Sequence, residues 1–437
     1  MSAELKPLFE PKSIFLVGAS ELTGEEKIFS ELFHSLVQNI SSYKKGKVFL
    51  VDLSGRVQSC YKSVSKIKVG LDLAVAVLPE KLLARNLHKL LSRQPKFLVI
   101  VASKVGEELA KKTRKKTLII GPESIGVINT KNGLIAVPGR WQIFSGDVAF
   151  ISQDSCIAGN VLSLATTTGI GKLVNVDENF GIDESDILTY LSKDKETRCI
   201  CVYLKKVRDG RKFIRALSET IPEKPVIVLS GSVAGAEILE AAVKQAGGII
   251  VRDIREMLNG AAALVRQPSL HGEKVAVITN ASGPAELFET HLSRKNMVLA
   301  KPSPETVEKI RKQHPQAEIS NFIDLGKMAD GDVYKRVAEL LLSDEEVDGI
   351  VMINSMKLTS FGLEDLRKIA EIAKKIKEKP LVNVALCAND NAAFKEIVSE
   401  STLPIYSQVE EAAEAIDILR CWGKLLRKTP TYLNSPR

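Results

Sequence analysis

Ser13-Ile-Phe-Leu-Val-Gly-Ala-Ser20 is a short apolar run that ends in three small residues, and a predicted helix follows it. Apolar runs of this length, bounded by residues that break regular structure, are typical of buried parallel strands. The same unit of strand, turn and helix recurs along the chain, and the apolar residues are mostly Ile, Leu, Val and Ala. The sequence therefore predicts an α/β fold of parallel sheets covered by helices on both faces.

The predicted strands form three groups, which we interpret as three doubly wound nucleotide-fold domains. The strands lie at 14–17, 48–51, 73–78, 97–101 and 118–120, then at 148–152, 172–176, 199–204, 226–229 and 249–251, and finally at 275–279, 349–353, 381–386 and 404–406. At ~150 residues per domain, a chain of 437 residues also suggests about three. The predicted domains span 1–130, 147–266 and 272–425, with a frayed tail at 426–437 and seams at 131–146 and 267–273.

The composition excludes several classes of protein. Charged residues make up 26% of the chain with both signs interspersed, so disorder is not expected. The net charge of +8 is a mild basic bias, and its densest patch, 111–116, has no aromatic residues between the basic ones. This patch fits either a solvated helix end or attraction to an anion, and nucleic-acid binding is not predicted.

Cysteine and histidine usage argues against disulfides and metal sites. The six cysteines include no C-x-x-C pair, and the five histidines have no ligand spacing. We therefore predict no metal and a reduced, cytoplasmic compartment. No secretory signal is found, and the longest apolar run is of strand length, so no membrane association is expected.

Small residues follow several predicted strands, at the edge of the sheet where nucleotide folds bind ligands. Gly18-Ala19-Ser20, with Gly24 further along the same turn, could bring backbone N–H groups to a phosphate or could simply form a tight turn. Gly121-Pro122 allows the same two interpretations. At Ser152-Gln-Asp-Ser155 we favour Asp154 as a helix N-cap, and at 281–284 we favour a turn with Pro just inside a helix.

Motifs in a fixed order resemble the α chain of ADP-forming (NDP-forming) acetyl-CoA and acyl-CoA synthetases, and more distantly the succinyl-CoA synthetase α chain. The resemblance runs from about Pro11 to Trp422. Its motifs are Ser13-Ile with Val17-Gly-Ala-Ser20, Cys60-Tyr-Lys-Ser-Val64, Gly121-Pro with Ile125-Gly-Val-Ile-Asn129, Ile151-Ser-Gln153, Tyr203-Leu with Val207-Arg-Asp-Gly-Arg-Lys-Phe213, Gly231-Ser-Val-Ala-Gly235, Lys244-Gln-Ala-Gly247 and Thr279-Asn-Ala-Ser-Gly-Pro284.

This resemblance implies a Rossmann-like CoA-binding domain followed by two flavodoxin-like, succinyl-CoA synthetase-like domains. That family joins a carboxylic acid to CoA with a nucleoside triphosphate, through a phosphohistidine. CoA or acyl-CoA would be the ligand of the first domain, and nucleotide would bind only through a partner β chain with an ATP-grasp fold. The positions expected to bind the cofactor are Gly18, Ala19, Ser20, Gly24, Leu78, Pro79, Gly121 and Pro122.

The catalytic positions that the resemblance implies are changed. No histidine lies between residues 91 and 270, and Leu229-Ser230 stand where the histidine loop precedes Gly231. The glutamate that would orient the histidine is Lys205, and the phosphate-cradling Ser-Gln-Ser-Gly turn carries Asp154. The loop at 177–179 has become acidic. Because leucine has no nitrogen to carry a phosphoryl group, no catalytic residue is predicted.

The CoA positions are altered less. Asp52-Leu53 and Glu123 replace residues of the family pattern, and the loop at 102–106 lacks the family's Gly-Phe. Three functions stay open: a non-catalytic scaffolding or regulatory subunit, an active ligase subunit whose phosphohistidine comes from another chain, and a CoA or nucleotide sensor. The expected partners are a second copy of the chain, an ATP-grasp β chain or a paralogous α chain.

Overall fold

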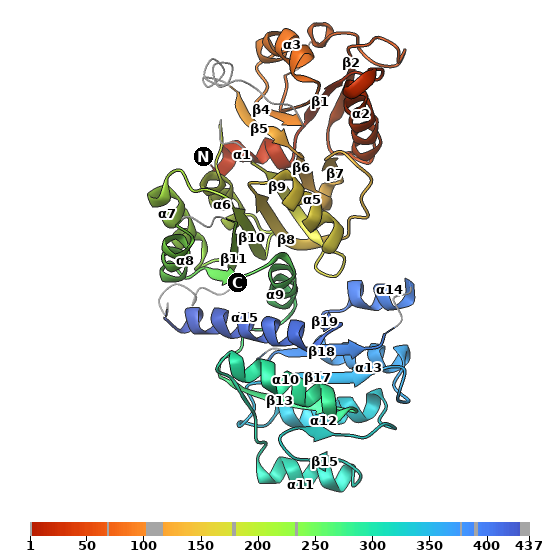
Figure 1. Ribbon diagram of the computed structural model, residues 1–437, viewed down its shortest axis with the longest axis vertical. Coiled ribbons are helices and arrows are strands. Elements are labelled where there is room, and N and C mark those ends of the chain that lie inside the picture. Colours follow the sequence, from red (N-terminus) through yellow and green to blue (C-terminus); the bar gives the residue numbers. More distant parts are fainter. Residues whose placement is uncertain are drawn as a thin grey trace. The chain divides into compact units, whose positions relative to one another are not determined.

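The computed structural model describes residues 2–67, 70–101, 117–176, 181–231, 235–375, 378–388 and 392–428 (Figure 1). Strands and helices alternate along the chain, which divides into two compact units, Met1–Ile250 and Val251–Arg437. The predicted α/β class with parallel sheets is confirmed. The basic patch at 111–116 and the loops at 102–106 and 177–179 lie outside the described residues.

The first sheet has five parallel strands in the order β2-β1-β3-β4-β5. They are β1 (Ser13–Gly18), β2 (Lys47–Asp52), β3 (Leu73–Val77), β4 (Phe97–Val101) and β5 (Leu118–Ser124). The helical segments are η1 (Gly24–Glu26), α2 (Lys27–Ile40), η2 (Val64–Lys66) and α3 (Glu80–Ser92). Leu83, Leu87 and Leu90 of α3 share a buried cluster with Phe15 and Val17 of β1, so the apolar stripe of α3 covers one face.

The last strand of this sheet is longer than predicted. We expected it to end at Ile120, before a turn, but β5 continues to Ser124. The Gly121–Pro122 peptide bond is cis, and the pairing of β4 with β5 shifts register there. Gly and Pro therefore lie inside an irregular edge strand, where a missing N–H is tolerated.

The second sheet has seven strands in the order β12-β11-β10-β8-β9-β6-β7. They are β6 (Val127–Asn129), β7 (Leu134–Ala136), β8 (Ser145–Ser152), β9 (Ile170–Asn175), β10 (Cys199–Leu204), β11 (Val226–Ser230) and β12 (Ile249–Val251). The helical segments are η3 (Thr130–Asn132), α5 (Ser155–Leu164), α6 (Glu184–Ser192), α7 (Gly210–Thr220) and α8 (Ala236–Gln245).

Two strands of this sheet were not predicted. β6 pairs antiparallel with β9, and β7 pairs antiparallel with β6. Each has only three residues, too few to show a strand period, so the sequence around them resembled a seam. The first strand of the second sheet to occur in the chain, β6, thus lies before residue 131. The domain bounds at 1–130, 147–266 and 272–425 stay a prediction.

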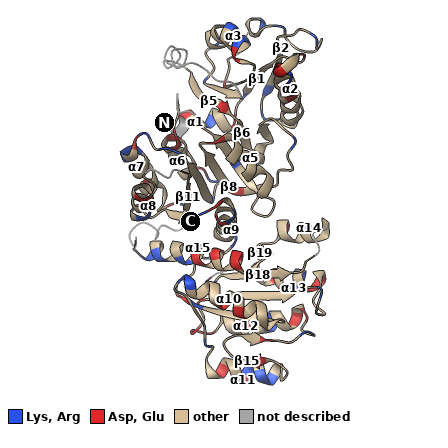
Figure 2. Ribbon diagram, in the orientation of Figure 1, with Lys and Arg blue, Asp and Glu red and all other residues tan. Residues whose placement is uncertain are grey.

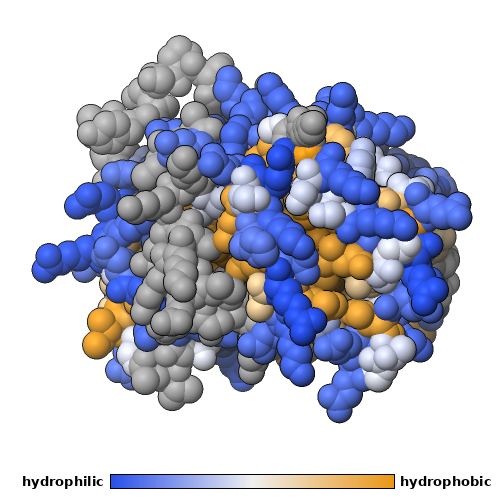
Figure 3. All heavy atoms as spheres, turned by 90° about the horizontal axis from the view of Figure 1, so that it is seen from above, coloured by the Kyte–Doolittle hydropathy of each residue, from blue (hydrophilic) through white to orange (hydrophobic). Residues whose placement is uncertain are grey.

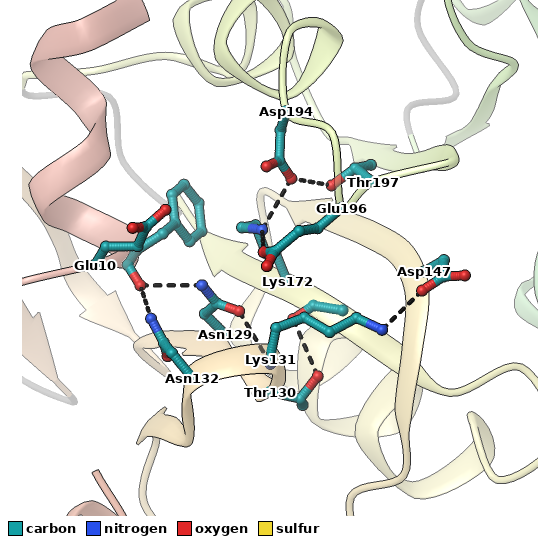
Figure 4. Close-up of polar contacts among 12 residues, drawn as sticks. Glu10, Asn129, Thr130, Lys131, Asn132, Asp147, Lys172, Asp194, Glu196 and Thr197 are labelled. Atoms are coloured by element: carbon teal, nitrogen blue, oxygen red, sulfur yellow. Dashed lines mark hydrogen bonds and ion pairs between the residues drawn. The ribbon is translucent and has the colours of Figure 1, made fainter. Parts of the chain in front are cut away.

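The N-terminal helix α1 (Ser2–Phe9) is anchored to the second sheet (Figure 4). The Phe9 ring stacks on Tyr190 of α6, with 5.3 Å between ring centroids. The Phe9 carbonyl accepts hydrogen bonds from the side-chain amides of Asn129 at 3.1 Å and Asn132 at 2.8 Å. A segment before the first predicted strand therefore belongs to the packing of the first compact unit.

The third sheet lies in the second compact unit, in the order β15-β16-β13-β17-β18-β19, with β14 also paired to β13. The strands are β13 (Lys274–Thr279), β14 (Val298–Leu299), β15 (Glu318–Ile319), β16 (Ile323–Asp324), β17 (Gly349–Ser355), β18 (Leu381–Leu386) and β19 (Ile405–Tyr406). The helices are α9 (Ile254–Arg266), α10 (Ser282–Arg294), α11 (Pro304–Gln313), α12 (Gly331–Leu342), α13 (Leu363–Ala373), α14 (Ala392–Glu400) and α15 (Val409–Lys428). Acidic and basic residues are spread over the helices of both units (Figure 2).

Candidate functional site

The first part of the candidate site is the start of helix α5, directly after strand β8. Asp154 is the N-cap: its Oδ1 accepts the backbone N–H of Ile157 at 2.8 Å. The Ser152 hydroxyl donates to the Asp154 carbonyl at 2.7 Å. This confirms Asp154 as the predicted cap. A helix N-terminus attracts anions, and here the chain itself supplies the negative charge.

Lys205 lies beside that cap, because β10 is the parallel neighbour of β8 and both strands end at the same edge. Its Nζ is 2.8 Å from Oδ2 of Asp154. Burial raises the pKa of Asp154, but hydrogen bonds from Lys205 and from the backbone of Ile157 outweigh this and lower it overall. The carboxylate is therefore ionised at neutral pH. Asp154 and Lys205, at two positions where the sequence departs from the pattern that the resemblance implies, neutralise each other.

Gln153 ties the ends of β8 and β10 together. Its Oε1 accepts the backbone N–H groups of Lys205 at 2.7 Å and Lys206 at 2.9 Å, and its Nε2 donates to the Lys206 carbonyl at 2.9 Å. The same Nε2 donates to Glu184 Oε2 of α6 at 2.9 Å. Glu184 is buried, which raises its pKa. Both the oxygen and the nitrogen of the Gln153 amide are thus hydrogen-bonded within the protein.

The end of β11 shows what stands in place of the histidine loop. Leu229 is 6% exposed and belongs to the core. A Cβ atom on Gly231 would lie 2.1 Å from the Tyr203 hydroxyl, so this position is closed to any larger residue unless Tyr203 moves. Residues 232–234 lie outside the described part of the chain. No histidine in the sequence lies between 91 and 270, so the segment around β11 supplies no histidine that could accept a phosphoryl group.

Five of the eight residues predicted to bind CoA lie at the carboxyl ends of strands in the first sheet. Gly18 ends β1, and Ala19 and Ser20 follow it. Leu78 and Pro79 follow β3, the neighbour of β1, and Pro79 is the N-cap residue of α3. The sheet therefore brings these two groups to one edge. Gly121 and Pro122 lie inside β5, two strands beyond β3, and Gly24 begins η1.

Asp52, at the end of β2, dominates the polar contacts of this edge. Its buried carboxylate accepts the backbone N–H and hydroxyl of Ser20 at 2.9 and 2.8 Å and those of Ser54 at 3.1 and 2.6 Å. The backbone N–H groups of Arg56 and Val57 add two contacts at 3.1 Å each. Burial raises the pKa of Asp52, but these hydrogen bonds outweigh it and hold it well below its usual range. Ser20 N–H therefore already faces an anion.

Gly18 has a packing reason to be glycine, because a Cβ there would lie 2.1 Å from the Phe33 ring of α2. Gly24 has a conformational reason, since its φ is +62° and open space surrounds it. In the part of the face that Figure 3 does not draw in grey, apolar side chains are visible between hydrophilic ones.

In the third sheet, the turn residues act as structural caps. Ala281 is the N-cap residue of α10, and Pro284 lies in the first turn of that helix, as predicted. Asp324 Oδ1 accepts the backbone N–H of Gly326 at 2.9 Å and so caps the turn after β16. The sequence did not reveal the neighbouring role of Asn280, whose Oδ1 accepts Ser355 N–H at 2.9 Å and joins the ends of β13 and β17.

Comparison with known proteins identifies the family. Residues 145–264 match the succinyl-CoA ligase like flavodoxin domain. The chain is 31% identical to the α subunit of ADP-forming acetate–CoA ligase II of Pyrococcus furiosus, over 93% of this chain and 95% of that one. The chain belongs to the family of ADP-forming acyl-CoA synthetase α chains. The family's isoform I α subunit from the same organism is 27% identical over 96% of this chain and 98% of its own.

Solved structures with the same fold are also known. A crystal structure of a Pyrococcus horikoshii OT3 protein has a TM-score of 0.86 at 30% identity and covers 97% of this chain and 99% of its own. A dinucleotide forming acetyl-coenzyme A synthetase 1 of Ca. Korarchaeum cryptofilum, solved with phosphate and ADP, has a TM-score of 0.84 and covers 100% of both chains. At 24% identity, this second likeness shows the fold alone.

Two further features bear on membrane and metal binding. No helix in the described ranges combines the length and the apolar character needed to cross a bilayer. Within those same ranges, no three His, Cys, Asp or Glu side chains are grouped as metal ligands would be.

Proposed function

We propose that this chain is a non-catalytic member of the α-chain family that acts as a scaffolding or regulatory subunit. The observation that carries the proposal is the Asp154–Lys205 pair at the start of α5. The resemblance puts a phosphoryl group at this helix start and an orienting carboxylate on the neighbouring strand. Here the Asp154 carboxylate accepts the helix N–H and is paired with Lys205, so a phosphoryl dianion would have to displace this carboxylate from the start of the helix.

The loss of charge stabilisation accompanies the loss of the nucleophile. A histidine supplied by another polypeptide would still need donors aimed at the phosphoryl oxygens. At the start of α5, Asp154 already accepts the Ile157 N–H. The Gln153 amide is hydrogen-bonded to the backbone and to Glu184, and Leu229 is buried. These contacts favour the non-catalytic role over an active ligase subunit completed by another chain.

A phosphorylation assay tests the proposal. The purified chain is mixed with an ATP-grasp β chain of the family, Mg²⁺ and γ-³²P-labelled ATP, and acid-labile label on each polypeptide is measured. A family α chain that carries the histidine is the positive control. We expect label on the control and none on this chain. Acid-labile label in near-equimolar amount on this chain would contradict the proposal.

A second measurement addresses the regulatory role. Acetyl-CoA formation by an active family ligase is measured with increasing amounts of this chain, and complex formation is followed by light scattering after size exclusion. We propose that the chain binds a partner of this family, so the mass of the ligase particle in light scattering and the KM of the ligase should both change. If neither quantity changes at equimolar amounts, a regulatory role towards that partner is rejected.

CoA binding at Gly18, Ala19, Ser20, Gly24, Leu78, Pro79, Gly121 and Pro122 stays a prediction. Asp52 bears on it, because an anion at Ser20 would have to compete with a carboxylate that is fully hydrogen-bonded. Calorimetric titration with CoA, acetyl-CoA and dephospho-CoA tests it. Saturable binding that weakens without the 3′-phosphate would support a CoA receptor, and no heat at about 1 mM ligand would reject it.

A further inference from the structure

A cavity of about 480 Å³ opens at the amino-terminal edge of the first sheet. Its walls come from the residues at or just before the starts of neighbouring strands: Lys12 and Ser13 at β1, Lys47 at β2 and Lys96 at β4. The predicted CoA positions lie at the carboxyl ends of the strands, which is the opposite edge. The cavity is therefore separate from the site already described.

The cavity carries an excess of positive charge. Asp72 is its one carboxylate, and both oxygens are occupied: Oδ1 by Lys96 Nζ at 2.8 Å and Oδ2 by the backbone N–H of Lys12 at 2.8 Å. Within the described part of the chain, the ammonium groups of Lys12 and Lys47 have no acidic partner. Two lysine charges are thus left to attract an anion.

The backbone that carries these two lysines is fixed. Lys12 donates its N–H to Asp72, and its carbonyl accepts Lys47 N–H at 2.9 Å. The Tyr43 hydroxyl donates to the Pro11 carbonyl at 2.6 Å, next to Lys12. Gly46 is required beside them, since a Cβ there would lie 2.4 Å from the Pro11 carbonyl. The lysine stems therefore start from positions set before any ligand binds.

Besides Ser13, Gly70 and Gln94, the rest of the lining includes two apolar side chains. Phe49, partly exposed, and Leu71, buried, both contribute to the wall. The Phe49 ring is held edge-on against Phe15, with 5.3 Å between ring centroids. An inorganic ion would leave this surface unused, whereas a ligand with a hydrocarbon or aromatic body would cover it.

We propose that this cavity binds a small organic anion, a carboxylate or phosphate with an apolar body. The anionic group lies beside Lys12 and Lys47, and the body packs on Phe49 and Leu71. The inference is independent of the proposed function, because it uses none of the residues of the α5 site and none of the predicted CoA positions. The proposed site lies at the amino-terminal edge of the first sheet, opposite the edge at which CoA is predicted to bind.

The test uses the full chain with benzoate as the probe, measured by saturation-transfer NMR and calorimetry. Benzamide has the same shape without the charge, inorganic phosphate has the charge without the body, and phenyl phosphate distinguishes a phosphate site from a carboxylate site. We expect benzoate or phenyl phosphate to bind with a Kd of about 1 mM or below, and benzamide and phosphate to bind at least about fivefold more weakly.

Variants locate the binding. Lys12→Gln with Lys47→Gln removes both charges and keeps the backbone hydrogen bonds, so we expect binding to weaken about tenfold. Lys44→Gln with Lys45→Gln is the matched control, since these exposed lysines lie in the turn just before Lys47 and do not line the cavity. Equal binding of benzoate and benzamide, an equal loss in both double variants, or no binding of any probe at about 10 mM would overturn the proposal.

Discussion

Replacing Lys172 by methionine should destabilise the protein more than any exposed lysine replacement. Lys172 lies in β9 with 1% of its side chain exposed, and its Nζ is 2.8 Å from both Asp194 Oδ2 and Glu196 Oε2 (Figure 4). Asp194 also accepts the Thr197 hydroxyl at 2.5 Å. Methionine fills a similar volume but takes away the ammonium group that is hydrogen-bonded to Asp194, which is 11% exposed, and leaves only the charge of Lys224 to act on it.

The size of the effect follows from burial. Removing one partner of a buried ion pair costs about 3–5 kcal/mol. Glu196 is 49% exposed and can turn to water, so we expect Lys172→Met to lie at the lower end, about 3 kcal/mol. Lys131→Met is the matched control: its Nζ is also 2.8 Å from a carboxylate, Asp147, but these side chains are 31% and 37% exposed. That loss should be about 0–1 kcal/mol.

Urea unfolding followed by circular dichroism, with hydrogen exchange of the β9 amides, measures both variants at pH 7. Burial raises the pKa of Asp194, but Lys172 and Thr197 lower it overall. Its contribution is therefore present at neutral pH and disappears as the pH falls below about 4, so the gap between the wild type and Lys172→Met should narrow there. Equal losses in Lys172→Met and Lys131→Met at pH 7 would refute the reasoning.

Four other substitutions, with Gly283→Ala as a control, test separate parts of the structure. Gly18→Ala should lower the free energy of unfolding by about 1–3 kcal/mol, because the new Cβ would overlap the Phe33 ring. Gly24→Ala should lower it by about 1–2 kcal/mol, because the φ of this residue is positive. Gly283→Ala, in open space at the start of α10, should leave thermal unfolding unchanged. Burial, followed by the nearby charge of Glu256, raises the pKa of Glu414 to about 7. The stability that the protonated Glu414 contributes is therefore lost as the pH rises through 7. Glu414→Gln should raise the Tm at pH 8 and leave it unchanged at pH 5. Asp52→Asn should cost about 1–3 kcal/mol in urea unfolding, because an amide presents donors to the Ser20 and Ser54 donors.

Each of these has an outcome that contradicts it. A Gly18→Ala protein as stable as Gly283→Ala would mean that Phe33 moves aside freely. If Glu414→Gln raises the Tm at pH 5 as much as at pH 8, its effect does not come from the ionisation of Glu414. A fully stable Asp52→Asn would show that the loop after β2 does not depend on the carboxylate.

The sequence was a good guide to the parallel strands, because buried strands consist of continuous apolar runs. The predicted strand at 199–204, for example, coincides with β10 (Cys199–Leu204). It failed where strands are too short to show a period, as at β6 and β7, and at β5, where Gly121 and Pro122 looked like a strand end. Only the pairing with β4 and β9 shows these segments to be strands.

At the candidate site, the sequence located the changed residues but could not show that they interact. Asp154 and Lys205 are far apart in sequence, and only the parallel pairing of β8 with β10 places them 2.8 Å apart. Asp52 was seen as a departure from the family pattern, but its hydrogen bonds to Ser20 depend on the pairing of β1 with β2. Side-chain partners across strands require the register, which periodicity does not contain.

The same replacement has occurred in two sheets of this protein. At the end of β2, Asp52 accepts the Ser20 N–H that a phosphate at the first turn would use. At the start of α5, Asp154 accepts the Ile157 N–H that a phosphoryl group would use. In both places a carboxylate of the chain satisfies donors that would otherwise need a ligand or water. A phosphate at either place would have to displace a carboxylate that is already hydrogen-bonded, and this supports the proposal that the chain does not take part in phosphoryl transfer.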